Sequence, residues 1–169
     1  EAKLYLDGNS VASKKFEIRA INLYDLVAGK AKAATDAKKW ALVIGIERYK
    51  KAAHVQFAEK DASLVSLFLT HSLGVPPQNV ITLLNDDATK AEVEFIVKDR
   101  LKGLLREDDT LYVYYSGHGI PADETPYLLP YDGDAESHVI TAYPLEALYY
   151  DLDSLRAKNI FVFLDTCFS

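Results

Sequence analysis

Four short, largely apolar runs alternate with segments of helical periodicity from residue 40 onward, and this alternation constrains the fold more than any other feature of the sequence. Each run ends at polar residues, as strands covered on both faces do, and the runs occupy 41–46, 80–84, 110–115 and 159–164. Between them, apolar side chains recur three and four positions apart in 57–73, 89–104 and 144–156. This order predicts an α/β domain with a mostly parallel central sheet and helices on both faces.

The expected helices carry start and stop signals. Thr89 and Glu92 have the spacing of a capping box directly before an apolar helical face. Gly74 follows the segment 57–73 and suits a helix C-terminus, while Pro144 stands near the first turn of the last expected helix. These signals support three separate helices between the strands.

Residues 1–35 do not share the alternation of apolar runs and helical segments that begins at residue 40. They are predicted to form a β-hairpin extension followed by a linker, with the main domain at 36–169. Two short strands, 3–6 and 14–20, flank the turn-rich Asp7-Gly8-Asn9, and 28–34 is small and basic. A two-stranded hairpin is marginal alone, so we expect it to be the tail of an upstream β domain or to dock on the main domain. An extension with no role is the alternative.

The composition excludes several classes of protein. The 169 residues carry a formal net charge of −6 and are 49% hydrophobic, which argues for a globular domain rather than a disordered chain. The sequence lacks a block of Lys and Arg and any apolar run of about 18 residues, so neither nucleic acid nor a membrane is an expected partner. The single cysteine, Cys167, excludes an internal disulfide, and a free thiol is best kept in a reducing cytoplasm.

A histidine and this cysteine follow two of the expected strands at the point where each strand ends. Ser116-Gly117-His118-Gly119 comes after the third strand, and Asp165-Thr166-Cys167 comes after the fourth. Because the carboxyl ends of parallel strands meet at one edge of a sheet, His118 and Cys167 are predicted to lie within reach of each other. An imidazole can take the thiol proton and leave a strong nucleophile, and the N–H groups of Gly119 and Cys167 are candidates for holding an oxyanion.

Each residue also has a simpler interpretation. A lone cysteine at a strand end is often inert packing, and a histidine beside glycines is often a turn residue. The joint placement of His118 and Cys167 at one edge favours the catalytic interpretation.

The residues from Trp40 to Ser169 resemble the caspase-like cysteine peptidases, in particular the metacaspase and bacterial caspase-homologue branch. The resemblance lies in the motifs ALVIGI with Tyr49, FAEKDA at 57–62, YYSGHG at 114–119 and LDTCFS at 164–169. His118 and Cys167 are 49 positions apart, close to the roughly 50 typical of caspases. The cysteine motif departs from the animal caspase pattern and is similar to the metacaspase one.

The resemblance implies a three-layer sandwich with a Cys–His dyad and a peptide or protein substrate. It also implies that further strands of a small-subunit segment complete the sheet after the nucleophile. Those strands do not follow Cys167 in this sequence, so we interpret the chain as a fragment and expect that segment as a partner.

In the metacaspase branch two aspartates line the pocket for the P1 side chain, and by position these are Asp61 and Asp165. Two carboxylates in a partly desolvated pocket favour a cationic side chain, and bidentate pairing suits Arg better than Lys. The sequence therefore predicts cleavage after Arg or Lys. The alternatives are a solvent-facing carboxylate near a helix start for Asp61 and a loop-capping carboxylate for Asp165.

No cofactor or metal is assigned. Metacaspases often need calcium, and four carboxylates could supply oxygen ligands: Asp132, Asp134, Asp151 and Asp153. Asp132-Gly133-Asp134 is not a complete calcium loop, so a solvated acidic turn is the favoured interpretation. His54, His71 and His138 lack a partner spacing and receive no role.

Two other functions compete with a cysteine endopeptidase. One is a non-catalytic caspase-like module that binds or scaffolds proteins, because a fold alone does not establish activity. The other is a different cysteine hydrolase that acts on small amides.

Overall fold

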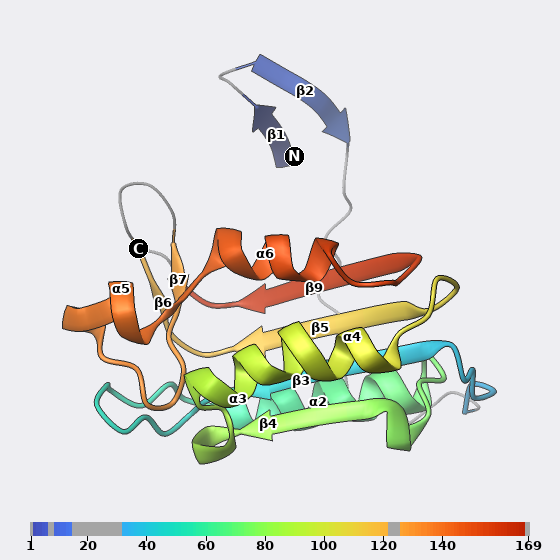
Figure 1. Ribbon diagram of the computed structural model, residues 1–169, viewed down its shortest axis with the longest axis horizontal. Coiled ribbons are helices and arrows are strands. Elements are labelled where there is room, and N and C mark those ends of the chain that lie inside the picture. Colours follow the sequence, from blue (N-terminus) through green and yellow to red (C-terminus); the bar gives the residue numbers. More distant parts are fainter. Residues whose placement is uncertain (1, 7–8, 15–31, 122–125, 168–169) are drawn as a thin grey trace.

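A four-stranded parallel sheet forms the centre of the molecule (Figure 1). The computed structural model describes residues 2–6, 9–14, 32–121 and 126–167. The strands stand in the order β4-β3-β5-β9, all parallel. Their bounds are β3 (Lys39–Gly45), β4 (Val80–Leu84), β5 (Thr110–Ser116) and β9 (Asn159–Asp165). These bounds confirm the four predicted strands to within two residues.

Helices cover both faces of this sheet, as predicted. One face packs on α2 (Ala58–His71), where Ala41 and Val43 of β3 lie in one cluster with Ala62 and Leu69. The other face packs on α3 (Lys90–Phe95), the π-helical turn η3 (Ile96–Arg100), α4 (Leu101–Leu104) and α6 (Leu145–Asp153). Because β3 is buried on both faces, its apolar residues form a continuous run rather than an alternating one. The three-layer α/β sandwich is confirmed.

The helix boundaries follow the local signals in the sequence. The Thr89 hydroxyl accepts a hydrogen bond from the Glu92 N–H at 3.2 Å and so caps α3. After α2, Gly74 takes a φ of 73°, a left-handed conformation that favours glycine. The segment 89–104, predicted as one α-helix, is interrupted by η3, where the backbone bonding widens to the π pattern for one turn.

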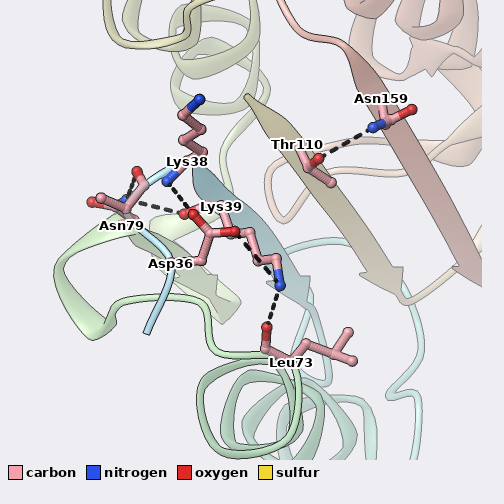
Figure 2. Close-up of polar contacts among 8 residues, drawn as sticks. Asp36, Lys38, Lys39, Leu73, Asn79, Thr110 and Asn159 are labelled. Atoms are coloured by element: carbon pink, nitrogen blue, oxygen red, sulfur yellow. Dashed lines mark hydrogen bonds and ion pairs between the residues drawn. The ribbon is translucent and has the colours of Figure 1, made fainter. Parts of the chain in front are cut away.

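Polar contacts tie the amino ends of the strands together, at the end of the sheet opposite the candidate site (Figure 2). The buried Asn79 side chain donates to the carbonyl oxygens of Ala37 and Lys39 at 3.2 and 3.0 Å. The Lys39 ammonium donates to the Leu73 carbonyl at 2.9 Å. The turn after α2, which contains η1 (Pro77–Asn79), is therefore fixed to the start of β3.

An antiparallel hairpin precedes the domain, formed by β1 (Ala2–Leu6) and β2 (Asn9–Lys14). The predicted hairpin is confirmed, but its second strand comes earlier than the expected 14–20, of which 15–20 lie outside the described residues. The described end of the expected linker packs on α2, with the Ala33 N–H donating to the His71 carbonyl at 2.8 Å. The domain boundary at 35 and 36 and the upstream β domain stay predictions.

A second, three-stranded antiparallel sheet was not predicted from the sequence. It contains β6 (Gly119–Ile120), β7 (Tyr127–Leu128) and β8 (Tyr143–Pro144). Strands of two residues are too short to show a period of two, which is why sequence patterning misses them. Four short helical turns were also missed, because three or four residues are too few to show a helical period: η1, η2 (Asn85–Asp87), η4 (Ala135–Ser137) and α5 (His138–Thr141). None of the helices that the structure describes is long and apolar enough to cross a bilayer.

Gly45 allows α2 to cross the end of β3 at close range. A Cβ atom at this position would lie 2.5 Å from the Ala62 Cβ and 2.6 Å from the Ala58 carbonyl oxygen. We expect Gly45→Ala to lower the free energy of unfolding by about 1–3 kcal/mol, because the helix must move away from the strand. Urea denaturation measures the change.

Gly103 offers the matched control on α4, since a Cβ there would meet nothing within 4 Å. We expect Gly103→Ala to be neutral or to stabilise the protein by up to about 1 kcal/mol, as for glycine in an exposed helix. Equal effects of the two substitutions would contradict the close packing of α2 on β3.

Candidate active site

The register of the parallel sheet brings the predicted catalytic side chains to one place. Gly45 of β3 pairs with Ser116 of β5, and Ser116 pairs with Asp165 of β9. His118 and Cys167 each stand two residues beyond a paired position, so both emerge at the carboxyl edge of neighbouring strands. The N–H of Gly117 donates to the Asp165 carbonyl at 3.3 Å and extends the pairing past the strand ends.

A cleft of about 360 Å³ opens at this edge. It is lined by all four side chains that the sequence analysis selected: Asp61, His118, Asp165 and Cys167. Gly119, the other selected residue, directly follows His118 and begins β6. The Cys167 side chain is exposed and Asp61 is half-buried.

The loop 46–57 forms a wall of the cleft that sequence reasoning missed. His54, Val55 and Gln56 line the cleft from this loop, although His54 had received no role. The signal that points to them is positional, because the loop follows the first strand of the sheet and lies at the same carboxyl edge.

The His118 ring is held by a backbone carbonyl. Its Nε2 lies 2.9 Å from the carbonyl oxygen of Ala53. A carbonyl oxygen only accepts hydrogen bonds, so this contact places a proton on Nε2 and leaves Nδ1 of the neutral ring unprotonated. The ring in this state has a basic nitrogen available for a thiol proton.

Two tyrosine hydroxyls fix the backbone of His118. The His118 N–H donates to the Tyr49 hydroxyl at 2.7 Å. The Tyr115 hydroxyl donates to the carbonyl oxygens of His118 and Leu129, each at 2.8 Å. A Cβ on Gly117 would collide with the Tyr49 hydroxyl, so only glycine fits between these groups.

The small antiparallel sheet leaves the Gly119 N–H outside its ladder. Gly119 is paired with Leu128, and the Leu129 N–H donates to the His118 carbonyl at 3.0 Å. In an antiparallel pair this pattern makes Gly119 and Leu128 a non-hydrogen-bonded pair. The Gly119 N–H is therefore not used by the sheet.

The two aspartates form an acidic end of the cleft. Burial raises the pKa of Asp61, and the negative charge of Asp165 raises it further. One Asp165 carboxylate oxygen lies 3.4 Å from the hydroxyls of Tyr114 and Ser116. Burial in turn raises the pKa of Tyr114 to about 12, so this phenol stays a hydrogen-bond donor at neutral pH.

The alternative roles were a carboxylate near a helix start for Asp61 and a loop-capping carboxylate for Asp165. Asp61 does stand in the first turn of α2, but it also lines the cleft. For Asp165, the hydrogen bonds that its side chain makes to the described residues come from hydroxyls rather than from loop N–H groups.

The four carboxylates considered for calcium do not form one group. Asp132 accepts from the Lys90 N–H at 2.9 Å, Asp134 pairs with Lys51 at 3.3 Å, and Asp151 accepts from a tyrosine hydroxyl at 2.6 Å. Across the described ranges, three or more His, Cys, Asp or Glu side chains never gather closely enough to hold a metal ion.

A family model described as the caspase domain matches residues 38–169, most of the chain. The chain belongs to the caspase family. This confirms the resemblance that the motifs around His118 and Cys167 indicated, and it places both residues inside the matched domain.

The similar proteins agree with this membership. This chain is 31% identical over 150 residues to a Desulfuromonadales bacterium protein whose name begins "Probable protease"; the match covers 77% of this chain and 18% of that protein. It is 30% identical over 124 residues to Metacaspase-1A of Aspergillus oryzae, and this match covers 68% of this chain and 27% of that protein. A crystal structure of a Geobacter sulfurreducens protein shares the fold, with a TM-score of 0.60 at 24% identity over 77% of this chain and 50% of that one. This chain thus spans about a quarter or less of the two curated relatives.

The stability of the caspase domain should depend on pH through Asp61. Its pKa is raised in the folded state, so ionising it costs more in the folded protein than in the unfolded chain. The contribution of Asp61 to the free energy of unfolding is therefore most favourable below the pKa of an aspartate in the unfolded chain. It becomes less favourable as the pH rises through the raised pKa of the folded state. We expect Asp61→Asn to raise the melting temperature at pH 7 and to raise it less at pH 4.

Asp86→Asn is the matched control, because it removes the same formal charge at an exposed position on η2. It accounts for the general gain from reducing the net charge of −6. Melting curves at the two pH values decide the comparison, and equal gains in both variants at pH 7 would show that Asp61 carries no special penalty.

Proposed function

We propose that this caspase domain is a cysteine endopeptidase with Cys167 as nucleophile and His118 as general base and acid. The observation that carries the proposal is that both side chains line one cleft together with two carboxylates. The contact between Nε2 and the Ala53 carbonyl supports it, because it leaves Nδ1 of His118 able to accept a proton.

In the first step Nδ1 of His118 takes the thiol proton and the Cys167 sulfur forms a bond to the scissile carbonyl carbon. The carbonyl oxygen becomes an oxyanion, which the N–H groups of Gly119 and Cys167 stabilise by hydrogen bonding. The C–N bond then breaks, and the imidazolium gives its proton to the departing amine.

Water completes the cycle. His118 takes a proton from a water molecule, whose oxygen attacks the thioester carbon. The proton returns to the Cys167 sulfur as the acid product leaves, so the dyad ends in its starting state. These steps use only the chain's own groups and water, and we propose that the chemistry needs no cofactor; the peptide assay below also measures the effect of calcium.

Asp61 and Asp165 are proposed to select a basic P1 residue. Burial raises the pKa of Asp61, and the negative charge of Asp165 raises it further; a cation that binds both carboxylates relieves that repulsion. A guanidinium can pair with both carboxylates through its planar fork, which favours Arg over Lys. A protein or peptide with Arg or Lys before the cleaved bond is therefore the proposed substrate.

The proposed partner is a small-subunit segment that pairs with the outer edge of β9. Among the strands that the structure describes, β9 is last in the sheet order, and its Phe161 and Phe163 are 46% and 52% exposed. Phe163 also borders an apolar groove of about 200 Å³ beside α2. Exposed aromatics on an edge strand favour covering by further strands and helices.

We propose a reducing compartment, the cytoplasm, because the mechanism needs Cys167 as a free thiol.

Peptides that differ only in the P1 residue test the activity and the specificity. We expect the protein to cleave peptides with Arg or Lys at P1, and Cys167→Ala to reduce turnover at least about a thousandfold. Asp61→Asn should weaken Arg and Lys cleavage more than Leu cleavage, because the lost carboxylate contacts only a cationic side chain. Initial rates with Arg, Lys, Asp and Leu peptides, with calcium and with a chelator, give the answer.

Asp86→Asn controls for the change in net charge. A preference for Asp or Leu at P1 would overturn the pocket assignment, and a Cys167→Ala variant as fast as the parent would overturn the mechanism. Absence of hydrolysis in the protein with its small-subunit segment, with a Cys167 that resists thiol reagents, would favour a scaffolding module.

Phe163→Asp tests the proposed partner. In the chain 1–169 alone Phe163 is half exposed, so we expect the free energy of unfolding to fall by about 1 kcal/mol, roughly half the value of a buried Phe side chain. In a protein that also contains the small-subunit segment, we expect a loss of about 1.5–3 kcal/mol, the value of a buried Phe side chain. Denaturation of both forms measures the difference, and equal small effects would contradict covering of this face.

A further inference from the structure

The loop 46–57 contacts His118 in three ways. The Tyr49 hydroxyl accepts from the His118 N–H at 2.7 Å. The Tyr49 ring lies against the imidazole, with ring centroids 4.9 Å apart and planes at 42°. The Ala53 carbonyl, four residues further along, accepts from Nε2 at 2.9 Å. The orientation of His118 thus depends on the conformation of a loop from a different strand.

Asn85, at the end of β4, holds the start of this loop. Its side-chain oxygen accepts from the N–H groups of Glu47 and Arg48, each at 3.0 Å. Its side-chain nitrogen donates to a Glu59 carboxylate oxygen at 2.8 Å. Asn85 is buried and has a φ of 48°, a left-handed conformation that asparagine tolerates better than most residues. Because the Asn85 side chain is buried, losing its hydrogen-bond partners costs more free energy than it would at an exposed position.

The rest of the loop is fixed by backbone bonds. The Val55 N–H donates to the Glu47 carbonyl and the Lys50 N–H donates to the Tyr131 carbonyl, both at 3.0 Å. Between these bonds the buried Tyr49 points its hydroxyl at His118. Burial raises the pKa of Tyr49, so its hydroxyl is neutral at the pH of catalysis.

We propose that Asn85 and Tyr49 are positioning residues for the general base: Asn85 anchors the loop 46–57, and through it Tyr49 and the Ala53 carbonyl hold His118 with its proton on Nε2. Neither residue is placed among the groups that line the cleft, so both act through His118. This inference rests on the proposed function, in which Nδ1 of His118 accepts the thiol proton.

The proposal has a chemical consequence that a purely structural role lacks. When the Ala53 carbonyl is held in place, the Nε2–H form of the neutral ring is favoured. When the loop loosens, the Nδ1–H form gains population, and that form has no free Nδ1 for the thiol proton. The turnover number should then fall by a larger factor than KM changes, because Asp61 and Asp165, which bind the substrate in the proposal, stand on α2 and β9 rather than on the loop.

Two substitutions test the two positions. Tyr49→Phe keeps the ring against His118 and removes only the hydroxyl, and we expect kcat to fall roughly three- to tenfold with KM unchanged. Asn85→Gly allows the positive φ and removes all three side-chain bonds, so we expect a larger fall, roughly ten- to a hundredfold.

The second readout is the protonation site of the ring, measured by ¹⁵N NMR of the histidine side chains with His118→Ala to assign the signal. We expect the parent to show the Nε2–H form and both variants to show a mixture. The measurement does not require activity, so it remains decisive if the proposed peptidase function fails. Melting curves show whether each variant is folded; if Asn85→Gly has lost its fold, Tyr49→Phe, which removes only a hydroxyl, decides alone.

Tyr143→Phe is the matched control. Tyr143 is buried, and its hydroxyl donates at 2.6 Å to Asp151 on α6, in a contact that does not involve His118. We expect this variant to lose stability with the parental kcat and the parental ring form. A parental ring form and kcat in folded Tyr49→Phe and Asn85→Gly would overturn the proposal, as would an equal change in Tyr143→Phe.

Discussion

The parallel pairing of β5 with its two neighbours is the constraint on which the rest of the site depends. It sets Gly45, Ser116 and Asp165 side by side at one edge of the sheet. The groups that line the cleft come from the carboxyl ends of β5 and β9, from the loop 46–57 that follows β3, and from the start of α2. A shift of one residue in this register would turn the side chains of an entire strand to the opposite face. The burial of β3 and β5 between two helical layers makes such a shift costly.

The cleft combines two polar systems that are built differently. The His118 system is held by backbone groups and buried tyrosine hydroxyls, packed around a glycine that leaves them room. The acidic system of Asp61 and Asp165 is more open, and its charges repel one another. In the proposed function, a cationic P1 side chain that binds this acidic end of the cleft relieves the repulsion between the two carboxylates.

The prediction of the fold from sequence succeeded where patterns were long. The four strands of the central sheet and the Thr89 cap were predicted because runs of five or more residues and a side-chain cap are local features. The small sheet of β6, β7 and β8 was missed because two-residue strands form only when distant segments meet. The π-helical turn η3 was likewise invisible, because its apolar spacing is also compatible with an ordinary α-helix.

By itself the sequence determined the α/β order of elements, the family, and the candidates His118, Gly119, Cys167, Asp61 and Asp165. These features could be predicted because hydrophobic periodicity, turn residues and short motifs depend on residues that are close together in the sequence. Only the tertiary structure decided that the loop 46–57 forms a wall of the cleft, that the Ala53 carbonyl holds the imidazole, and that Asn85 anchors this loop. These contacts join residues that are 37 to 65 positions apart along the chain, and backbone carbonyls carry no sequence signal of their own.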